Sequence, residues 1–356
     1  MKALRIYAGP AARKHLEQDG LRPQDIGLIP GAAGGPKGLI LGPLDRFIFG
    51  SWLAQSSQSV HLVGASIGAW RMASACLHDP AAAFERLEHD YIHQHYALPP
   101  GRTRPLPRDV SASFGQSLQD FYGGRVDQVL SHPRYKLHVF VSRGRLLLAR
   151  ERSLRRAAGY AMAFLANAAS RKALGWWLER VVFSSQDPLP LNLGDYPTQL
   201  ARLDQTNFYQ SVRASCSIPF VLEAVHDIPG ALPGAYWDGG LTDYHLHLNY
   251  AALGPQLVLY PHFQKAVVPG WLDKGFKRRH RATPFLDNMI VLAPDPAWVA
   301  ALPNGKLPDR TDFARYAQDF AGRVKAWTQA AKASAQLADE FAEWLDKPDL
   351  ARIEPL

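Results

Sequence analysis

The chain has 356 residues and a formal net charge of +8 at pH 7, with 47% hydrophobic and 20% charged residues. This composition is that of an ordinary globular protein and argues against a disordered or fibrous chain. A chain of this length can bury a large core without disulfide bonds, and its two cysteines, Cys76 and Cys216, lack metal-ligand spacing.

Neither a cleaved leader nor a membrane span is predicted. The apolar start of the chain is interrupted at Gly9, too early for a signal peptide, and no apolar run approaches the ~18 residues of a transmembrane helix. We therefore expect a cytoplasmic protein. Peripheral contact with a membrane and signal-independent secretion both remain open.

Strands and helices alternate along the first part of the chain. Apolar strands are expected at 4–8, 25–30 and 59–65, each followed by a helix, at 11–18, 36–49 and 67–77. Pro36 suits a first helical position, because its missing N–H would have no partner there. This succession predicts a three-layer α/β/α sandwich with a mostly parallel central sheet. The loops after the second and third strands would lie at the carboxyl ends of neighbouring strands, where ligands bind in such sheets.

The rest of the chain has a less regular pattern. We expect a helix at 81–96, an irregular basic connection at 99–107 and a hairpin at 135–148 that turns at Arg143-Gly144. A mostly helical stretch should follow at 152–180, then strands at 181–184, 257–260 and 289–292. Residues 313–345 have the apolar spacing of one long amphipathic helix, with a break left open.

The segment Gly64-Ala-Ser-Ile-Gly68 has the G-x-S-x-G pattern of a nucleophile elbow. Such a turn exposes the Ser66 hydroxyl at the positive end of the following helix, and the two glycines let strand and helix approach closely. A glycine-serine turn without chemistry is the alternative. The position between an apolar strand and a helix favours a nucleophile.

A glycine-rich loop, Ala33-Gly-Gly-Pro-Lys-Gly38, follows the second strand. A phosphate-binding loop is not expected, because neither the Walker pattern nor G-x-G-x-x-G is present. The loop instead predicts an oxyanion hole with the N–H groups of Gly34 and Gly35 as donors. Pro36 has no N–H to contribute, and Lys37 would steady the loop or attract an anionic substrate group. A flexible strand-to-helix turn remains the alternative.

Asp238, in Trp237-Asp-Gly-Gly240, is the candidate base. Asp-Gly alone is a common turn dipeptide, but a serine nucleophile needs a group that accepts its proton. An α/β-hydrolase triad would place a histidine late in the chain, and none follows His280. His245 and His247 remain open as bases, although their alternate spacing is more typical of one face of a structural segment.

In this order, the three segments resemble the patatin-like phospholipase family. Its members carry a Gly-Gly-Gly-x-Arg/Lys-Gly loop, a G-x-S-x-G elbow and a distant Asp-Gly-Gly/Ala, which correspond to Ala33–Gly38, Gly64–Gly68 and Asp238–Gly240. The segment Arg213–Phe220 is similar to the family's Ala-Ser-x-Ala-x-Pro stretch. Together the matches span residues 25–243. Ala33 departs from the usual first glycine, and Pro36 stiffens the loop, which puts the substrate range in question more than the chemistry.

The resemblance implies a serine acyl-hydrolase of lipid esters, of the phospholipase A or lysophospholipase type, that uses a Ser66–Asp238 dyad without histidine. Ser66 would form an acyl-enzyme, Asp238 would accept its proton and later activate water, and Gly34 and Gly35 would stabilise the oxyanion. This scheme requires no metal and no cofactor. Residues 1–300 would form a patatin-like hydrolase domain, and residues 301–356 a helical extension packed on it.

Two other functions remain open: a carboxylesterase or thioesterase of small soluble acyl substrates, and a catalytically silent lipid-binding module. The arginine-flanked stretch 152–180, with Phe164, Trp176 and Trp177, is a candidate cap over the site or an ordinary core helix. The basic segment 274–281 is either a solvated loop or a surface for anionic membrane headgroups. Nucleic acid is not an expected partner, because no zinc-finger, RNP or helix-turn-helix pattern is present. Whether the chain has a protein partner is left open by the sequence.

Overall fold

The computed structural model describes residues 1–96, 105–150 and 153–356. The strands are β1 (Leu4–Ala8), β2 (Ile26–Gly31), β3 (Val60–Ala65), β4 (Tyr135–Gly144), β5 (Leu178–Ser184), β6 (Thr198–Arg202), β7 (Val225–His226), β8 (Ala235–Asp238), β9 (Leu257–Pro261), β10 (Met289–Pro294) and β11 (Ile353–Pro355). The α-helices are α1 (Pro10–Asp19), α2 (Gly42–Phe47), α3 (Ile67–Ala75), α4 (Pro80–Ile92), α5 (Pro107–Tyr122), α6 (Val126–Leu130), α7 (Ser153–Ala169), α8 (Arg171–Leu174), α9 (Phe208–Ser215), α10 (Gly240–Asp243), α11 (Pro296–Ala301), α12 (Thr311–Arg315), α13 (Phe320–Ala333) and α14 (Ala335–Asp346).

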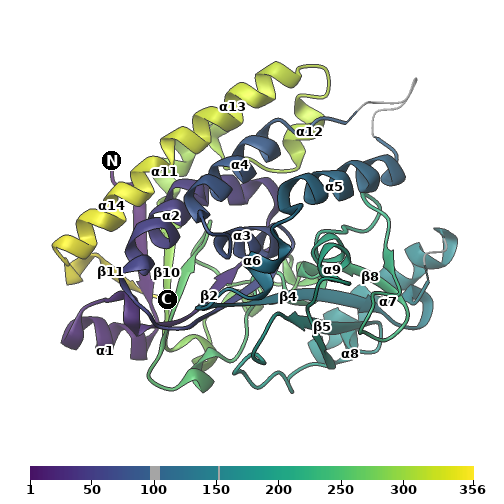
Figure 1. Cartoon of the computed structure of the whole chain (residues 1–356), viewed down its shortest axis with the longest axis horizontal. Coiled ribbons are helices and arrows are strands. Elements are labelled where there is room, and N and C mark those ends of the chain that lie inside the picture. The colour runs from purple at the N-terminus through teal and green to yellow at the C-terminus, as the bar shows by residue number, and fades with distance from the viewer. Residues whose placement is uncertain (97–104, 151–152) are drawn as a thin grey trace.

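One twisted sheet runs through the molecule in the order β11-β1-β10-β9-β2-β3-β4-β5-β6. The central strands β10, β9, β2, β3 and β4 are parallel to one another, whereas β1 is antiparallel to β10 and β5 is antiparallel to β4. Helices cover both faces of the sheet (Figure 1). The predicted three-layer α/β/α sandwich with a mostly parallel sheet is therefore confirmed.

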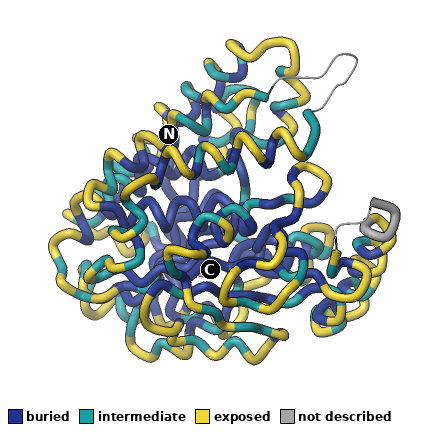
Figure 2. The backbone as a smooth tube through the Cα atoms, turned by 45° about the vertical axis from the view of Figure 1, so that its right-hand side comes forward, coloured by how far each residue is buried: buried dark blue, intermediate teal, exposed yellow. Residues whose placement is uncertain are grey.

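The three N-terminal strands form as expected, and the loops that follow β2 and β3 leave the sheet side by side. Gly31 at the end of β2 pairs with Gly64 near the end of β3, so the glycine-rich loop and the elbow emerge next to each other. Helix α3 then packs on β2, β3 and β4 with all nine of its residues buried. The strands and this helix form the buried centre of the molecule, beneath exposed outer segments (Figure 2).

The single helix expected at 36–49 is instead three consecutive segments of different helix type. A 3₁₀ segment spans Gly35–Leu41, α2 follows, and a π-helical turn spans Ile48–Trp52. Helix α2 is fixed to α3 by a buried ion pair, in which the Arg71 guanidinium donates to both carboxylate oxygens of Asp45 at 2.7 Å. This pair anchors the segment that follows the glycine-rich loop onto the helix that follows the elbow.

Two sequence predictions were wrong. The expected hairpin at 135–148 is instead the single strand β4, because Arg143 and Gly144 remain extended and pair with Glu179 and Leu178 of β5. The expected helix at 152–180 ends at Ala169 and resumes only as the short α8, and residues 178–180 belong to β5. Residue 152 and most of the expected connection at 99–107 lie outside the described residues.

The amphipathic stretch 313–345 is interrupted, so the break left open is present. Its apolar residues fall on α12, α13 and α14, and α14 packs against α2 and β1. Phe341 and Trp327 are buried as that pattern predicts, whereas Phe320 is exposed. Strand β11 pairs in parallel with β1. Among the described helices, none combines the length and apolar character needed to span a membrane.

Candidate active site

The turn between β3 and α3 holds Ser66 in a strained conformation. Its φ of 57° and ψ of −130° are unusual for a residue with a side chain, a strain that typically costs about 1–3 kcal/mol. The turn is tight because Gly64 and Gly68 lack side chains: a Cβ on Gly64 would lie 2.5 Å from the Ala69 Cα, and one on Gly68 would clash with the Gly31 carbonyl oxygen. The geometry is that of a nucleophile elbow.

Ser66 and Asp238 are in hydrogen-bond contact. The Ser66 hydroxyl donates to Asp238 Oδ2 at 2.7 Å, and the Gly240 N–H donates to the other carboxylate oxygen, also at 2.7 Å. Both residues are buried, with 3% and 4% exposure. The two oxygens of the carboxylate are thus oriented separately, one by the backbone of its own turn and one toward the serine.

The sheet brings these two residues together across 172 positions of sequence. Strand β3 pairs with β4 as far as Ala65 and Phe140, and β8 then pairs with β4 from Val141 and Asp238 onward. Because β5 pairs with the other edge of β4, β3 and β8 share one edge and run toward each other. Ser66 and Asp238 lie where their carboxyl ends meet.

Ser215, the last residue of α9, links the elbow to the aspartate turn. Its hydroxyl accepts the Ser66 N–H at 2.9 Å and donates to the Phe140 carbonyl at 2.7 Å, while its carbonyl accepts the Gly239 N–H at 3.1 Å. The neighbouring Ser217 carbonyl accepts the Asp238 N–H at 2.9 Å. No role for Ser215 or Ser217 was predicted from the sequence. The similarity of their segment to the Ala-Ser-x-Ala-x-Pro stretch was the available signal.

The glycine-rich loop lies beside Ser66, but its two candidate donors are placed differently. Gly35 lines the same cavity as Ser66, whereas Gly34 packs against the Phe263 ring, which a Cβ on Gly34 would approach to 2.5 Å. Among the described residues, the N–H groups of Gly34 and Gly35 have no hydrogen-bond acceptor, whereas the Ala33 N–H donates to the Tyr244 carbonyl at 2.9 Å. Gly35 is therefore the better placed of the two.

The cavity above Ser66 has a volume of about 120 Å³ and mainly apolar walls. Trp70, Val110, Phe114, Ile218 and Leu222 provide most of this surface. Arg310 and Phe313, from the C-terminal part of the chain, also line it, and so does the half-buried Cys216. Sequence analysis identified neither Arg310 nor Phe313 as a site residue.

Burial is the main influence on the ionisation of Asp238. It raises the pKa of this carboxyl above the ordinary value, and Arg310, the Ser66 hydroxyl, the Gly240 N–H and Lys274 oppose it in that order. A carboxylate with a raised pKa is a stronger proton acceptor than an exposed aspartate, which a neutral serine hydroxyl requires.

Neither histidine left open as a base contacts the dyad atoms in the described structure. His245 is buried, and its Nδ1 accepts the Val268 N–H at 3.0 Å. His247 lies near Thr283, with 3.4 Å between Nε2 and Oγ1. Burial lowers the pKa of both imidazoles, that of His247 to about 4. Both side chains therefore act as neutral parts of the packing around residues 244–248.

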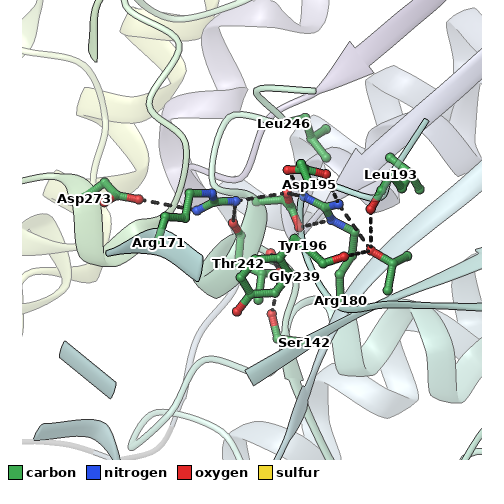
Figure 3. Close-up of polar contacts among 12 residues, drawn as sticks. Ser142, Arg171, Arg180, Leu193, Asp195, Tyr196, Gly239, Thr242, Leu246 and Asp273 are labelled. Carbon is green, nitrogen blue, oxygen red and sulfur yellow. Dashed lines mark hydrogen bonds and ion pairs between the residues drawn. The ribbon is translucent and has the colours of Figure 1, made fainter. Parts of the chain in front are cut away.

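A buried ion network holds the helix that follows Asp238. Arg180 donates to both carboxylate oxygens of Asp243 in α10, at 2.8 and 2.6 Å, and reaches Asp195 at 3.0 Å. Arg171 binds the Thr242 carbonyl at 2.5 Å and Asp273 at 3.4 Å (Figure 3). Burial alone would raise the pKa of Asp243, but Arg180 keeps this pKa below its ordinary value. The network fixes α10, and with it the Asp238-Gly-Gly turn.

Lys37 lies one residue beyond Pro36, and its ammonium is 5.2 Å from the centre of the Phe263 ring. Burial lowers its pKa. It has no contact with Ser66 or Asp238 in the described part of the molecule. In the same part of the chain, no three or more His, Cys, Asp or Glu side chains cluster in a way that could hold a metal ion.

We predict that Ser215→Ala destabilises the protein by about 1–3 kcal/mol, because it leaves the buried Ser66 N–H and Phe140 carbonyl without their partner. Any catalytic rate that depends on Ser66 should also fall in this variant, since the elbow loses a positioning contact. Ser217→Ala is the matched control, because the Ser217 hydroxyl donates only to the Arg213 carbonyl in the preceding helix α9. Urea unfolding of both variants is the measurement, and equal stability of the two would contradict the role of Ser215.

The similarity of the chain to known proteins is weak. No family model and no curated protein matches the chain. Among solved structures, the crystal structure of VipD from Legionella pneumophila is similar with a TM-score of 0.39 and 15% sequence identity, over 97% of this chain and 70% of that chain. A functional assignment must therefore come from the geometry of the site itself.

Proposed function

We propose that the protein is a serine acyl-hydrolase of lipid esters, with Ser66 as nucleophile and Asp238 as its base. The observation that carries the proposal is the 2.7 Å hydrogen bond from a serine hydroxyl on a strained strand-to-helix turn to a buried carboxylate. Serine becomes an effective nucleophile only when a positioned group accepts its proton. The Ser66–Asp238 pair meets this geometric requirement without a histidine.

In the proposed reaction, Ser66 Oγ bonds to the ester carbonyl carbon while its proton moves to Asp238 Oδ2. Collapse of the tetrahedral intermediate breaks the bond to the alcohol, which leaves with the proton from Asp238. Water then attacks the acyl-enzyme, gives a proton to Asp238, and releases the acid as that proton returns to Ser66 Oγ. The carboxylate thus serves as base and acid in turn.

The oxyanion of the intermediate needs donors that are not already engaged. The Gly35 N–H has no partner among the described residues and borders the cavity, so we assign it as the main donor, with Gly34 as the second. The N-terminus of α3, which begins at Ile67, adds a favourable dipole. In comparable enzymes the loss of one such donor raises the barrier by about 3–4 kcal/mol.

Apolar surface beside the cavity supports a lipid ester as substrate. Val221 lines the cavity and is 45% exposed, and α7 exposes Met162, Phe164 and Leu165. Phe220, which follows the cavity-lining Ile218 and precedes Val221, contacts Tyr160 of α7 and so connects α7 to the cavity wall. Exposed apolar groups of this kind are typical of a surface that receives acyl chains. In this proposal α7 lies at a membrane surface or forms the cap over the site.

The size of the cavity favours a second candidate, a carboxylesterase of short acyl substrates. A cavity of roughly 150 Å³ holds one benzene molecule, so the present 120 Å³ fits only a short acyl group. A longer chain would extend beyond the cavity, past the exposed Val221. The two candidates share the chemistry and differ in chain length.

We predict that Ser66→Ala abolishes labelling by a fluorophosphonate probe and lowers ester hydrolysis by at least about 1,000-fold, because the covalent step is lost. Asp238→Asn should reduce hydrolysis comparably, since an amide cannot accept the proton. Labelling by mass spectrometry and kcat/KM on nitrophenyl esters are the measurements.

His247→Gln is the control for these variants and should retain activity, because His247 does not contact the dyad atoms. Circular dichroism checks that each variant is folded. Persistent hydrolysis by Ser66→Ala would refute the nucleophile. An active Asp238→Asn with an inactive His247→Gln would replace the dyad with a histidine-based mechanism.

A chain-length series separates the two candidates. For a lipid hydrolase we expect kcat/KM on nitrophenyl esters to rise from butyrate to laurate and to increase further on micellar substrate, because apolar area is buried with each methylene. A maximum at the shortest esters, without an interfacial increase, would identify the second candidate instead.

We predict that kcat/KM falls at acidic pH with a midpoint above the ~4 of an ordinary aspartate. Burial raises the pKa of Asp238, so the active carboxylate is present above that pKa and is lost as pH falls through it. Arg310→Gln should move the midpoint to higher pH, because Arg310 stabilises the carboxylate. Profiles on a neutral ester test both statements, and a midpoint at or below ~4 would contradict them.

A further inference from the structure

Two cations from distant parts of the chain share one indole ring beside the cavity. The Lys274 ammonium lies 5.3 Å from the centre of the Trp271 ring and 4.1 Å from that of Tyr244. The Arg310 guanidinium lies 5.8 Å from the same Trp271 ring and lines the cavity that contains Ser66. Both positive charges are thus held by aromatic faces at the mouth of the site.

The glycine-rich loop brings a third cation to this group. A Cβ on Gly35 would lie 3.2 Å from Arg310 Nε, so the guanidinium packs directly on the loop. Lys37 follows two residues later, over the Phe263 ring against which Gly34 packs. Lys37, Lys274 and Arg310 therefore surround the loop that borders Ser66. We call these three residues the cation cluster.

The cation cluster has no acidic partner within ion-pair distance among the described residues. Nearby Lys306 shows the contrast, because it pairs with Asp309 at 2.7 Å and with Asp312 at 2.8 Å. Burial, together with repulsion from Arg310 and Lys37, lowers the pKa of Lys274 to about 7. Although Lys274 as a whole is exposed, its ammonium is covered by two rings. Like charges held together in this way are destabilising until an anion joins them.

We propose that the cation cluster binds an oxyanion group, phosphate or carboxylate, carried by the ester substrate itself, so the protein hydrolyses anionic esters. This inference rests on the proposed function and specifies its substrate class. Arg310 would present its planar fork to two oxygens of the anion, and the two lysines would add point charges. Because Arg310 lies against Gly35, the anion would bind close to the scissile carbonyl.

Arg310 and Lys274 have a second effect that the experiment must separate. Both favour the carboxylate form of Asp238 and so lower its pKa. A cluster that served only this purpose would affect neutral and anionic esters alike and would shift the acidic limb of the pH profile. Binding of a substrate anion affects the anionic ester alone, mainly through KM.

The test compares matched pairs of monomeric substrates at a pH on the plateau of each variant's profile. Dihexanoylglycerol phosphate and dihexanoylglycerol differ in the phosphate, and nitrophenyl hemiglutarate and nitrophenyl valerate differ in a carboxylate. We expect the wild-type protein to prefer one anionic member by at least about 10-fold in kcat/KM. The preferred pair identifies the anion as phosphate or carboxylate.

Arg310→Gln and Lys274→Gln should each lower kcat/KM on the anionic member about 10-fold more than on its neutral partner, mainly through KM. Arg278→Gln is the matched control, because Arg278 is an exposed cation four residues from Lys274, outside the cluster, and should alter neither. Equal losses on both members of a pair, or no wild-type preference in either pair, would overturn the anion site.

A binding measurement distinguishes failure of this inference from failure of the proposed function. Calorimetric titration of Ser66→Ala with dihexanoylglycerol phosphate and with nitrophenyl hemiglutarate needs no turnover. Binding that is lost in the double variant Ser66→Ala/Arg310→Gln supports the cluster even where no ester is hydrolysed and no probe labels Ser66. Normal probe labelling, with neither anion bound and no anionic preference, would overturn the cluster and leave the hydrolase in place.

Discussion

Strands β3 and β8 meet end to end along one edge of β4, and this shared edge sets the distance between Ser66 and Asp238. Because β3 runs parallel and β8 antiparallel to β4 along the same edge, their carboxyl ends point toward each other. The 2.7 Å contact between the two side chains is therefore a consequence of backbone pairing. Rigid strands position reacting groups more precisely than loops do, which a two-residue catalytic unit requires.

The strain at Ser66 is held in place by packing around it. Helix α3 is buried along its whole length, and the absence of side chains on Gly31 and Gly68 lets it lie directly on β2. Its displacement would break the buried Asp45–Arg71 pair, and the loss of one partner of such a pair typically costs about 3–5 kcal/mol. The free-energy cost of breaking this ion pair exceeds the ~1–3 kcal/mol cost of one strained residue. The elbow is stable because its helix has no other position to adopt.

Local sequence patterns predicted the parts of the structure that local sequence determines. The N-terminal strands, their helices and the elbow each lie within a short window, and their glycines have a fixed stereochemical purpose. The hairpin at 135–148 was wrong because Gly144 indicated a turn, whereas pairing with β5 keeps the chain extended there. Two of the partners of β4, namely β5 and β8, come from beyond residue 177, so no pattern within 135–148 could reveal them.

The same reasoning explains which site residues the sequence revealed. Ser66 and Asp238 carry recognisable neighbours, so they could be identified before their contact was known. The position of Ser215 beneath the elbow depends on the packing of α9 against β4 and β8, and sequence proximity does not predict it. Arg310 is 244 positions from Ser66 (310 less 66) and belongs to no motif, yet it lines the same cavity. Residues whose role depends only on the assembled fold require the structure.

Charge connects the C-terminal part of the chain to the proposed chemistry. Arg310 opposes the effect that burial has on Asp238 and keeps more of it ionised and ready to accept a proton. In the proposed first step the Ser66 proton neutralises Asp238, so the positive charge around the glycine-rich loop rises by one unit as the substrate oxygen becomes negative. Fixed cations then interact more strongly with the transition state than with the ground state, and only such differential interactions accelerate the chemical step. The cation cluster would thus contribute to rate as well as to substrate choice.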